Sequence, residues 1–233
     1  MSSPNENEYV VFYERQLPAL KPEWSGFAPL PLLEPSDHWT PVAENGDPLV
    51  RIDNDIVCTA AQWRRGWPGT SPHTYVRQPV AAALSAARAS LPEGLDLVVL
   101  DAHRSRETQV YLYQRAYTGT GLAPGFVADP NNAKIVPPHT TGGAVDVTLA
   151  WQGVPLALGT APGEYVDDSL LAALEDTPGE ARELRRLLYS VMTDAGFRGI
   201  PEEWWHFSIG DQEWAFQTSA TAAVYGPAER PVQ

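Results

Sequence analysis

Two short segments of this 233-residue chain combine residue types that can hold and use a divalent metal. His139 and Asp146 lie in the first segment, and His206 lies in the second, far along the chain. A catalytic zinc takes three nitrogen or oxygen ligands from the protein and keeps a fourth position for water. These three side chains supply such a set, and the sequence therefore predicts one catalytic Zn²⁺ per chain.

Glu203 lies three residues before His206 and is the predicted general base. A carboxylate beside a metal-activated water can take its proton and pass it to a leaving amine. Side chains three apart on an ideal strand face opposite sides, so this assignment requires a bulge, or a strand interrupted near Trp204 and Trp205. The neighbouring Glu202 is the alternative base.

Each of these residues, taken alone, is explained more simply as an unrelated polar side chain. A structural zinc is a second alternative, but it would need a fourth protein ligand and would leave Glu203 without a use. The combination of two histidines, an aspartate and a glutamate favours a catalytic centre.

The composition narrows the partners of such a centre. Acidic residues outnumber basic ones by 29 to 16, and the resulting net charge of −13 disfavours binding to nucleic acid. The single cysteine, Cys58, excludes an internal disulfide and a zinc site built from several cysteines. No stretch approaches the ~18–20 apolar residues that span a bilayer, and the polar N-terminus lacks the features of a secretion signal. A cytoplasmic location is expected, with no membrane partner, and the oligomeric state is not indicated.

The elements that must position these residues follow from the spacing of apolar side chains. Residues 79–91 carry them at helical spacing and predict an amphipathic helix. Residues 95–100 are apolar and β-branched, which is typical of a buried strand. The strand leads into Asp101-Ala102-His103-Arg104, whose side chains are expected to face a cleft. Ser105 is placed to cap a helix that continues to residue 117.

A loop rich in glycine and proline is expected over 118–138, and loops of this length tend to be functional. Residues 143–150 alternate in the manner of a strand, and a turn at 151–153 leads into a hairpin partner. The remaining predicted elements are helices over 167–175 and 179–195 and a strand over 197–209.

Three arginines of the helix predicted over 179–195 are interpreted as surface residues. Arg182, Arg185 and Arg186 are expected on its polar, solvated face. Glu180 and Glu183 are their expected partners, at the spacing at which helical side chains meet.

The order of elements predicts a single-domain α+β fold with a central antiparallel sheet, flanking helices, a zinc cleft and a Pro-rich, loop-rich N-terminal segment. The parts expected within it are a disordered N-terminus at 1–8, a Pro-rich extended segment wrapping the core at 9–78, a catalytic core at 79–210 and a C-terminal segment at 211–233.

Three segments together resemble the D-alanyl-D-alanine dipeptidase family, the VanX-type zinc metallopeptidases of peptidase family M15. They are a His-x-x-Gly-x-Ala-x-Asp pattern at 139–146, a Glu-Trp-Trp-His pattern at 203–206 and Asp-Ala-His-Arg-Ser at 101–105. The similarity runs from about residue 79 to residue 209 and is weaker in the Pro-rich N-terminal third.

The resemblance implies a role for each matching residue. It implies that His139, Asp146 and His206 hold zinc and that Glu203 is the catalytic acid and base. Arg104 matches a family arginine near the scissile carbonyl, where a guanidinium would stabilise the developing oxyanion. It also implies an intracellular enzyme that cleaves a D,D-dipeptide with a free amine and a free carboxylate.

The chain departs from the family pattern around the substrate. Pro137 stands where the family usually has a serine. The family also tends to have an aspartate that can pair with the substrate ammonium, a few residues after a Met-Gly-Ser/Thr segment. In this chain no aspartate follows the corresponding Leu158-Gly159-Thr160 before Asp167, and Glu164 is the expected partner instead. His103 replaces a family tyrosine and is either a substrate contact, a partner of a site residue or a hydrogen-bonded core residue. The candidate substrate-binding residues are Glu164, His103, Thr160 and Trp205.

The sequence thus predicts a zinc metallodipeptidase that hydrolyses a small peptide bond, most simply that of a D-alanyl-D-alanine-type dipeptide. Two alternatives stand beside it. One is a related D,D- or L,D-carboxypeptidase or amidohydrolase acting on another substrate, and the other is a catalytically silent, zinc-stabilised binding protein. The biological role, whether antibiotic resistance, cell-wall turnover or biosynthesis, is not indicated.

Overall fold

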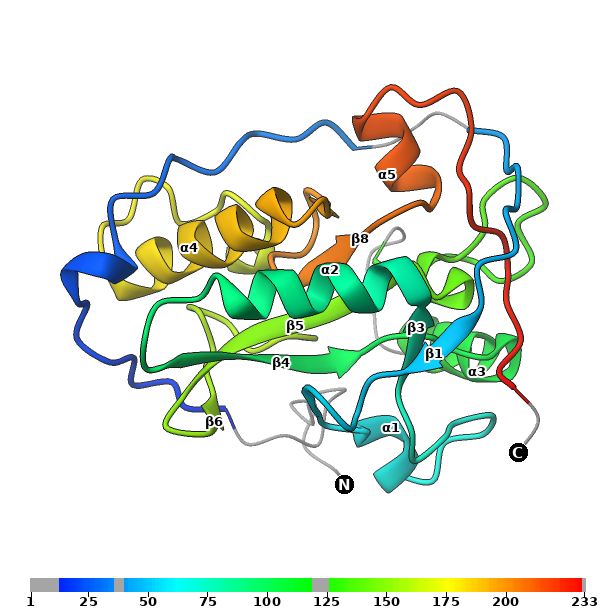
Figure 1. The fold of residues 1–233 in the computed structure, drawn as a ribbon, viewed down its shortest axis with the longest axis horizontal. Helices are drawn as coiled ribbons and strands as arrows, with labels where there is room; N and C mark the ends of the chain where they lie inside the picture. The colour runs from blue at the N-terminus through cyan, green and yellow to red at the C-terminus, as the bar shows by residue number, and fades with distance from the viewer. Residues whose placement is uncertain (1–12, 36–39, 119–125, 232–233) are drawn as a thin grey trace.

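A mixed β-sheet with helices on both of its sides forms the framework of the protein (Figure 1). The computed structural model describes residues 13–35, 40–118 and 126–231. The strands are β1 (Leu49–Arg51), β2 (Val57–Cys58), β3 (Tyr75–Arg77), β4 (Leu95–Asp101), β5 (Ala144–Trp151), β6 (Val154–Pro155), β7 (Arg198–Gly199) and β8 (His206–Ser208). The α-helices are α1 (Ala61–Arg64), α2 (Gln78–Ala89), α3 (Arg106–Tyr117), α4 (Glu180–Asp194) and α5 (Gln212–Gln217), and the short 3₁₀ turns are η1 (Pro22–Trp24), η2 (Pro138–Thr141) and η3 (Asp167–Ser169).

The main sheet has the strand order β2-β4-β5-β8-β7, with β6 pairing β5 as a hairpin. Strands β4, β5, β8 and β7 run antiparallel, as predicted, but β2 pairs parallel to β4 at the edge. The predicted antiparallel sheet is therefore confirmed for its central strands, and the edge strand β2 departs from it. The edge strand comes from the N-terminal segment, which reaches β4 by a long connection rather than a tight hairpin, and such a connection allows either direction.

Strand β5 lies at the centre of the sheet and is buried over almost all its length. On one face, Leu97 and Val99 of β4 and Val147 and Leu149 of β5 are at most 1% exposed and belong to the main core. Each such side chain contributes about 1.5–3 kcal/mol by leaving water. Burial on both faces explains the apolar, β-branched sequence of these strands.

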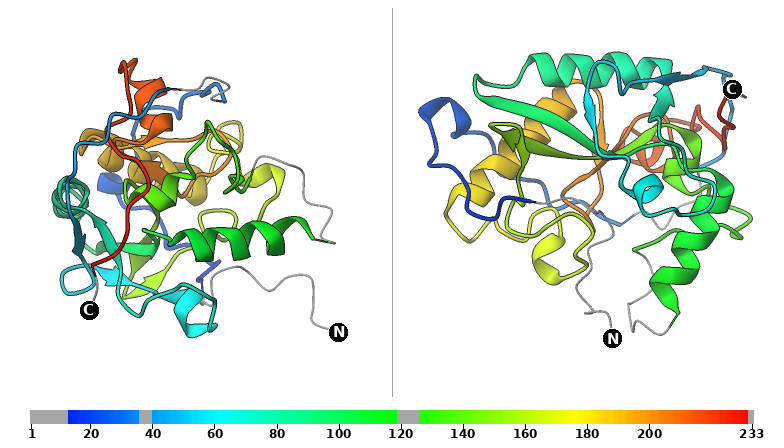
Figure 2. Two further views of the ribbon diagram at one scale, coloured as in Figure 1. Left: turned by 90° about the vertical axis from the view of Figure 1, so that its right-hand side faces the viewer. Right: turned by 90° about the horizontal axis from the view of Figure 1, so that it is seen from below.

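Helices α2 and α4 pack against each other and cover that core face (Figure 1). Helix α3 lies on the opposite side of the sheet from α2 in both views of Figure 2. The helices predicted over 79–91, 106–117 and 179–195 are confirmed to within a residue or two. Ser105 caps α3 as predicted, because its Oγ accepts a hydrogen bond from the backbone N–H of Thr108.

Three local predictions are wrong. Residues 167–175 form only the 3₁₀ turn η3 followed by further turns, with no α-helix. Residues 197–209 are not one strand, because β7 and β8 are separated by a turn. Arg185 does not lie on a solvated face: it is 2% exposed and donates hydrogen bonds to the carbonyls of Leu158, Leu170 and Asp168.

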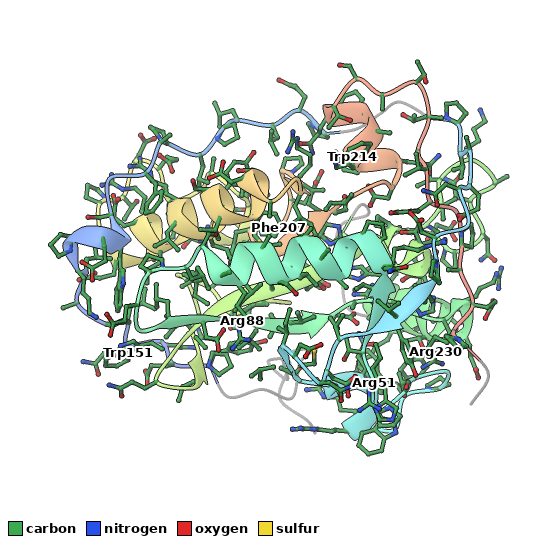
Figure 3. The ribbon with its side chains drawn as sticks, viewed as in Figure 1. Arg51, Arg88, Trp151, Phe207, Trp214 and Arg230 are labelled. Carbon is green, nitrogen blue, oxygen red and sulfur yellow. The ribbon has the colours of Figure 1, made fainter. Side chains whose placement is uncertain are left out.

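The described residues of the Pro-rich segment are partly extended, but they also form β1, β2, β3 and α1. Trp24 in η1 is 1% exposed and packs into the main core. After α5, which carries Trp214 (Figure 3), the C-terminal segment runs back beside β1 (Figure 1), and the N–H of Ala228 donates to the carbonyl of Thr140. The predicted disordered N-terminus at 1–8 lies outside the described residues. No helix in the described part of the chain has the length and hydrophobicity needed to cross a bilayer.

Candidate metal centre

The three predicted ligands converge on one buried point. His206 Nδ1 lies 3.0 Å from Asp146 Oδ1 and 3.2 Å from His139 Nε2, and His139 Nε2 lies 3.3 Å from Asp146 Oδ1. Ligand atoms bonded to a tetrahedral zinc at 2.0–2.1 Å lie about 3.3–3.4 Å apart, so this triangle has nearly the dimensions of one tetrahedral face. All three side chains are at most 5% exposed. The donor set therefore fits a zinc ion with one position left for another ligand.

Two neighbouring strands and one turn bring the ligands together. Asp146 of β5 is directly paired with His206 of β8 in the antiparallel register, so their side chains lie on the same face. His139 lies in η2, just before β5. The turn that follows it needs Gly142, whose φ is +73° and whose missing Cβ leaves room for Leu49.

The hydrogen bonds around the triangle favour metal binding. His139 Nδ1 donates to the carbonyl of Ala102 at 2.8 Å, so Nε2, the ring nitrogen that faces the triangle, is the one that can bind a metal once it carries no proton. Burial opposes ionisation of Asp146, but the charges and hydrogen bonds of His139 and His206 outweigh it and hold the pKa of Asp146 well below its usual range. The carboxylate is thus ionised and ready to bind a cation.

Glu203 lies in the turn just before β8, not in the strand itself. This turn removes the objection that residues three apart on a strand face opposite sides. Glu203 is 7% exposed and lines the same cavity as the three ligands. Glu202 also lines that cavity but is more exposed, and burial raises its pKa.

Arg104 enters the site from the end of β4. Its guanidinium hydrogen-bonds Asp101 and the side-chain oxygen of Gln109, the latter at 3.2 Å. Its Nη2 lies 3.6 Å from Asp146 Oδ2, so a fixed positive charge stands beside the metal triangle. Arg104 is 8% exposed and reaches the cavity wall.

A cavity of about 190 Å³ opens onto the triangle. Trp205, one of the candidate substrate-binding residues, forms part of its wall. Its ring stands 6.4 Å from that of Tyr165, which stands 5.1 Å from Phe126, and all three line the cavity. These three rings therefore give the cavity wall an aromatic stretch.

Three of the proposed substrate-binding residues lie outside this cavity lining. Glu164 pairs with Arg15 and accepts a hydrogen bond from the backbone N–H of Ala161. Thr160 accepts a hydrogen bond from the indole of Trp204 at 2.9 Å, which is a packing contact beneath the site.

His103 turns away from the cavity as well. Its Nε2 bonds the carbonyl of Ala228 at 2.8 Å, and burial lowers its pKa to about 4. Among the alternatives for His103, the structure therefore favours the hydrogen-bonded core residue. Pro137, which stands in place of the family serine, begins the turn that carries His139.

The cavity also contains residues that sequence reasoning did not single out. Gln109 and Glu213 contribute polar groups, and Tyr165 contributes an aromatic ring. None of them belongs to a recognisable motif. The one signal for Gln109 was its position one turn into the helix that follows Arg104.

Comparison with known proteins gives the following similarities. Residues 70–223 match the family described as D-ala-D-ala dipeptidase, an M15 peptidase family. A D-alanyl-D-alanine dipeptidase of Synechocystis sp. is 30% identical over 217 residues, covering 76% of this chain and 87% of that protein. A D-alanyl-D-alanine dipeptidase of Escherichia coli (strain K12) is 34% identical over 131 residues, covering 56% of this chain and 62% of that protein.

Two solved structures show weaker similarity. The vancomycin resistance D,D-dipeptidase VanXYg, in complex with a D-Ala-D-Ala phosphinate analogue, is 21% identical with a TM-score of 0.39, covering 64% of this chain and 57% of that chain. The vancomycin resistance D,D-pentapeptidase VanY, in complex with Zn(II), is 18% identical with a TM-score of 0.38, covering 66% of this chain and 83% of that chain.

Proposed function

Since the chain belongs to the M15 family of D-ala-D-ala dipeptidases and is a metallodipeptidase, we propose that it cleaves a D-alanyl-D-alanine-type dipeptide with one zinc held by His139, Asp146 and His206. The observation that supports this most strongly is the buried triangle of donor atoms, 3.0–3.3 Å apart, in the lining of a cavity. Three ligands and an open fourth position are the arrangement of a catalytic zinc.

Zinc bound there would supply a Lewis acid that lowers the pKa of a water toward ~7 and polarises the scissile carbonyl. The protein's own groups then have two tasks. They must move a proton, and they must stabilise the negative charge that develops on the carbonyl oxygen.

Glu203 is the group proposed to move the proton. As a carboxylate it accepts a proton from the attacking water, and as the resulting acid it donates that proton to the amine of the leaving residue. Its burial beside the triangle keeps the carboxylate in one place and limits its contact with bulk water.

Arg104 is the group proposed to stabilise the oxyanion. Asp101 and Gln109 hold its guanidinium before any substrate arrives, so little reorganisation is required as charge develops. Its position beside Asp146 places this positive charge at the metal side of the cavity.

The test is hydrolysis by the zinc-loaded protein of D-Ala-D-Ala, its L,D and L,L isomers, N-acetyl-D-Ala-D-Ala and a longer peptide ending in D-Ala-D-Ala. We expect cleavage of the free D,D-dipeptide, abolished by a chelator and restored by zinc. Preferential cleavage of the blocked or longer peptide would show a carboxypeptidase instead. Zinc binding without cleavage of any peptide would show a binding protein and overturn the proposal.

A further inference from the structure

The charges that line the cavity are unevenly distributed. Within the described lining, Arg104 is the one arginine or lysine, whereas four residues carry carboxylates. The acidic residues are Asp146, Glu202, Glu203 and Glu213. A cavity with this excess of acid suits a ligand that brings positive charge of its own.

Most of these carboxylates are already engaged. Asp146 is part of the metal triangle, and Glu203 is the proposed proton carrier. Glu213 accepts a hydrogen bond from the Gln217 side chain at 3.2 Å. Glu202 is different, because no side chain of the described residues donates a hydrogen bond to it or forms an ion pair with it.

The surroundings of Glu202 make this lack of a side-chain partner costly. The side chain is partly buried against the cavity wall, and this burial raises its pKa, although its own backbone N–H and the charge of His206 oppose the rise. A carboxylate that has lost part of its hydration without gaining a cation destabilises the empty site. A cationic group of a ligand would restore the lost interaction.

Arg104 and Glu202 reach the cavity from strands on either side of β5. Arg104 follows β4, Glu202 precedes β8, and β5 with Asp146 lies between these two strands. A dipeptide is itself a dipole, with an ammonium at one end and carbonyl and carboxylate oxygens toward the other. When its oxygens face Arg104, its ammonium points away from Arg104, toward the β8 side from which Glu202 reaches the cavity.

We propose that Glu202 binds the N-terminal ammonium of the substrate and thereby makes a free amine a requirement for cleavage. This inference rests on the proposed function and assigns to Glu202 the role that sequence reasoning gave to Glu164. Glu164 is held by Arg15 outside the cavity lining, whereas Glu202 lies on the cavity wall beside the proposed base.

The experiment compares kcat/KM for D-Ala-D-Ala and N-acetyl-D-Ala-D-Ala in the zinc-loaded full chain and in its Glu202→Gln variant. A hydrogen bond between charged groups is worth enough to change affinity roughly 10- to 100-fold. We therefore expect Glu202→Gln to raise KM for the free dipeptide by that factor, with kcat within a few-fold of the parent. The value of kcat/KM for the acetylated dipeptide should not fall.

Two matched variants each remove one carboxylate charge near Glu202. Glu213→Gln removes the charge of another cavity residue, whose side chain already accepts a hydrogen bond from Gln217. It should change the preference for a free amine less than Glu202→Gln does. Glu164→Gln should leave that preference at the parent value. A loss of preference in Glu164→Gln but not in Glu202→Gln would overturn the proposal.

Other results also separate the possibilities. A fall in kcat with unchanged KM in Glu202→Gln would make Glu202 a proton carrier and overturn the proposal. If the parent cleaves neither dipeptide, the proposed function fails, and calorimetric titration of the zinc-loaded protein with both dipeptides tests Glu202 by itself. The assignment is supported if Glu202→Gln binds the free dipeptide more weakly than the parent does but binds the acetylated dipeptide equally well. Equal binding of the free dipeptide by parent and variant contradicts it.

Discussion

The two sides of the cavity differ in how firmly they are built. On the metal side, the three ligands, Glu203 and Arg104 are each at most 8% exposed. On the substrate side, Trp205 is 1% exposed, but five other lining residues are partly exposed, namely Phe126, Tyr165, Ile200, Glu202 and Glu213. The metal side is fixed by strand register and backbone hydrogen bonds, whereas the substrate side consists of turns and of residues that follow β8.

This difference separates chemistry from specificity. The metal triangle needs its atoms within a few tenths of an ångström, and adjacent strands provide that precision. The substrate side needs only complementary charge and shape, which turns can vary without disturbing the metal. We therefore expect substitutions on the metal side to affect kcat and metal content, and those on the substrate side to affect KM and selectivity.

The largest effect on turnover is expected from Asp146→Asn. The amide cannot supply the negative charge that holds the cation between the two histidines, so zinc content and activity should both fall, the activity by at least about 10³-fold. Zinc analysis and kcat/KM on the same sample measure this. Asp55→Asn, at an exposed position, is the matched control and should retain both. Full zinc content in Asp146→Asn would contradict the ligand assignment.

A smaller effect on turnover is expected from Arg104→Lys. Lysine keeps the charge but cannot reproduce the planar guanidinium that contacts Asp101, Gln109 and the cavity together. We expect kcat to fall roughly 10- to 100-fold with zinc content unchanged. A change in KM with unchanged kcat would instead show that Arg104 binds the substrate and does not stabilise the transition state.

Arg185→Met tests the support beneath the site and should affect stability more than turnover. Arg185 lies over the Trp204 ring, 5.2 Å from its centre, and its loss leaves the carbonyls of Leu158, Leu170 and Asp168 without this donor, the first of them in a buried hydrogen bond. The free energy of unfolding should fall by about 3 kcal/mol or more. Arg182→Met removes a more exposed ion pair on the same helix, between Arg182 and Glu183, and should cost at most about 1 kcal/mol of unfolding free energy. Chemical denaturation measures both, and equal losses would contradict the buried role of Arg185.

The smallest effect is expected from His103→Gln, which should leave turnover at neutral pH unchanged. His103 has a folded-state pKa of about 4, lowered by burial and by the charges of Arg230 and Arg77, although Asp101 and the Ala228 carbonyl oppose this. The unfolded chain takes up this proton near pH 6.5, so stability falls as the pH drops from about 6.5 to 4. The variant should show a shallower fall in its unfolding free energy over this range. An identical pH dependence would show that His103 is not buried as a neutral group.

The sequence predicted that the three candidate ligands would converge, because they lie in short patterns whose spacing reflects one strand pair and one turn. His139, Asp146 and His206 could be grouped by their chemistry alone. The helices over 79–91 and 106–117 were also predictable, since the first has a regular apolar period after Pro79 and the second has a capping residue at Ser105.

The substrate side could not be predicted in the same way. Glu213 and Tyr165 reach the cavity through tertiary packing of α5 and of the turns before η3, and no local pattern records such contacts. Arg185 was misplaced for a related reason. Its spacing on α4 resembles that of its exposed neighbours, and only the carbonyls of the packed segment 158–170 explain its burial.

The most direct test of the account is the zinc content and the turnover of D-Ala-D-Ala measured on one sample of Glu203→Gln. Because Glu203 lines the cavity without being one of the three ligands, the variant should bind one zinc per chain like the parent. Its kcat should fall about 10²- to 10⁴-fold, since the amide cannot carry a proton. Loss of zinc together with activity, or near-parental kcat with zinc bound, would contradict the division between metal ligands and proton carrier.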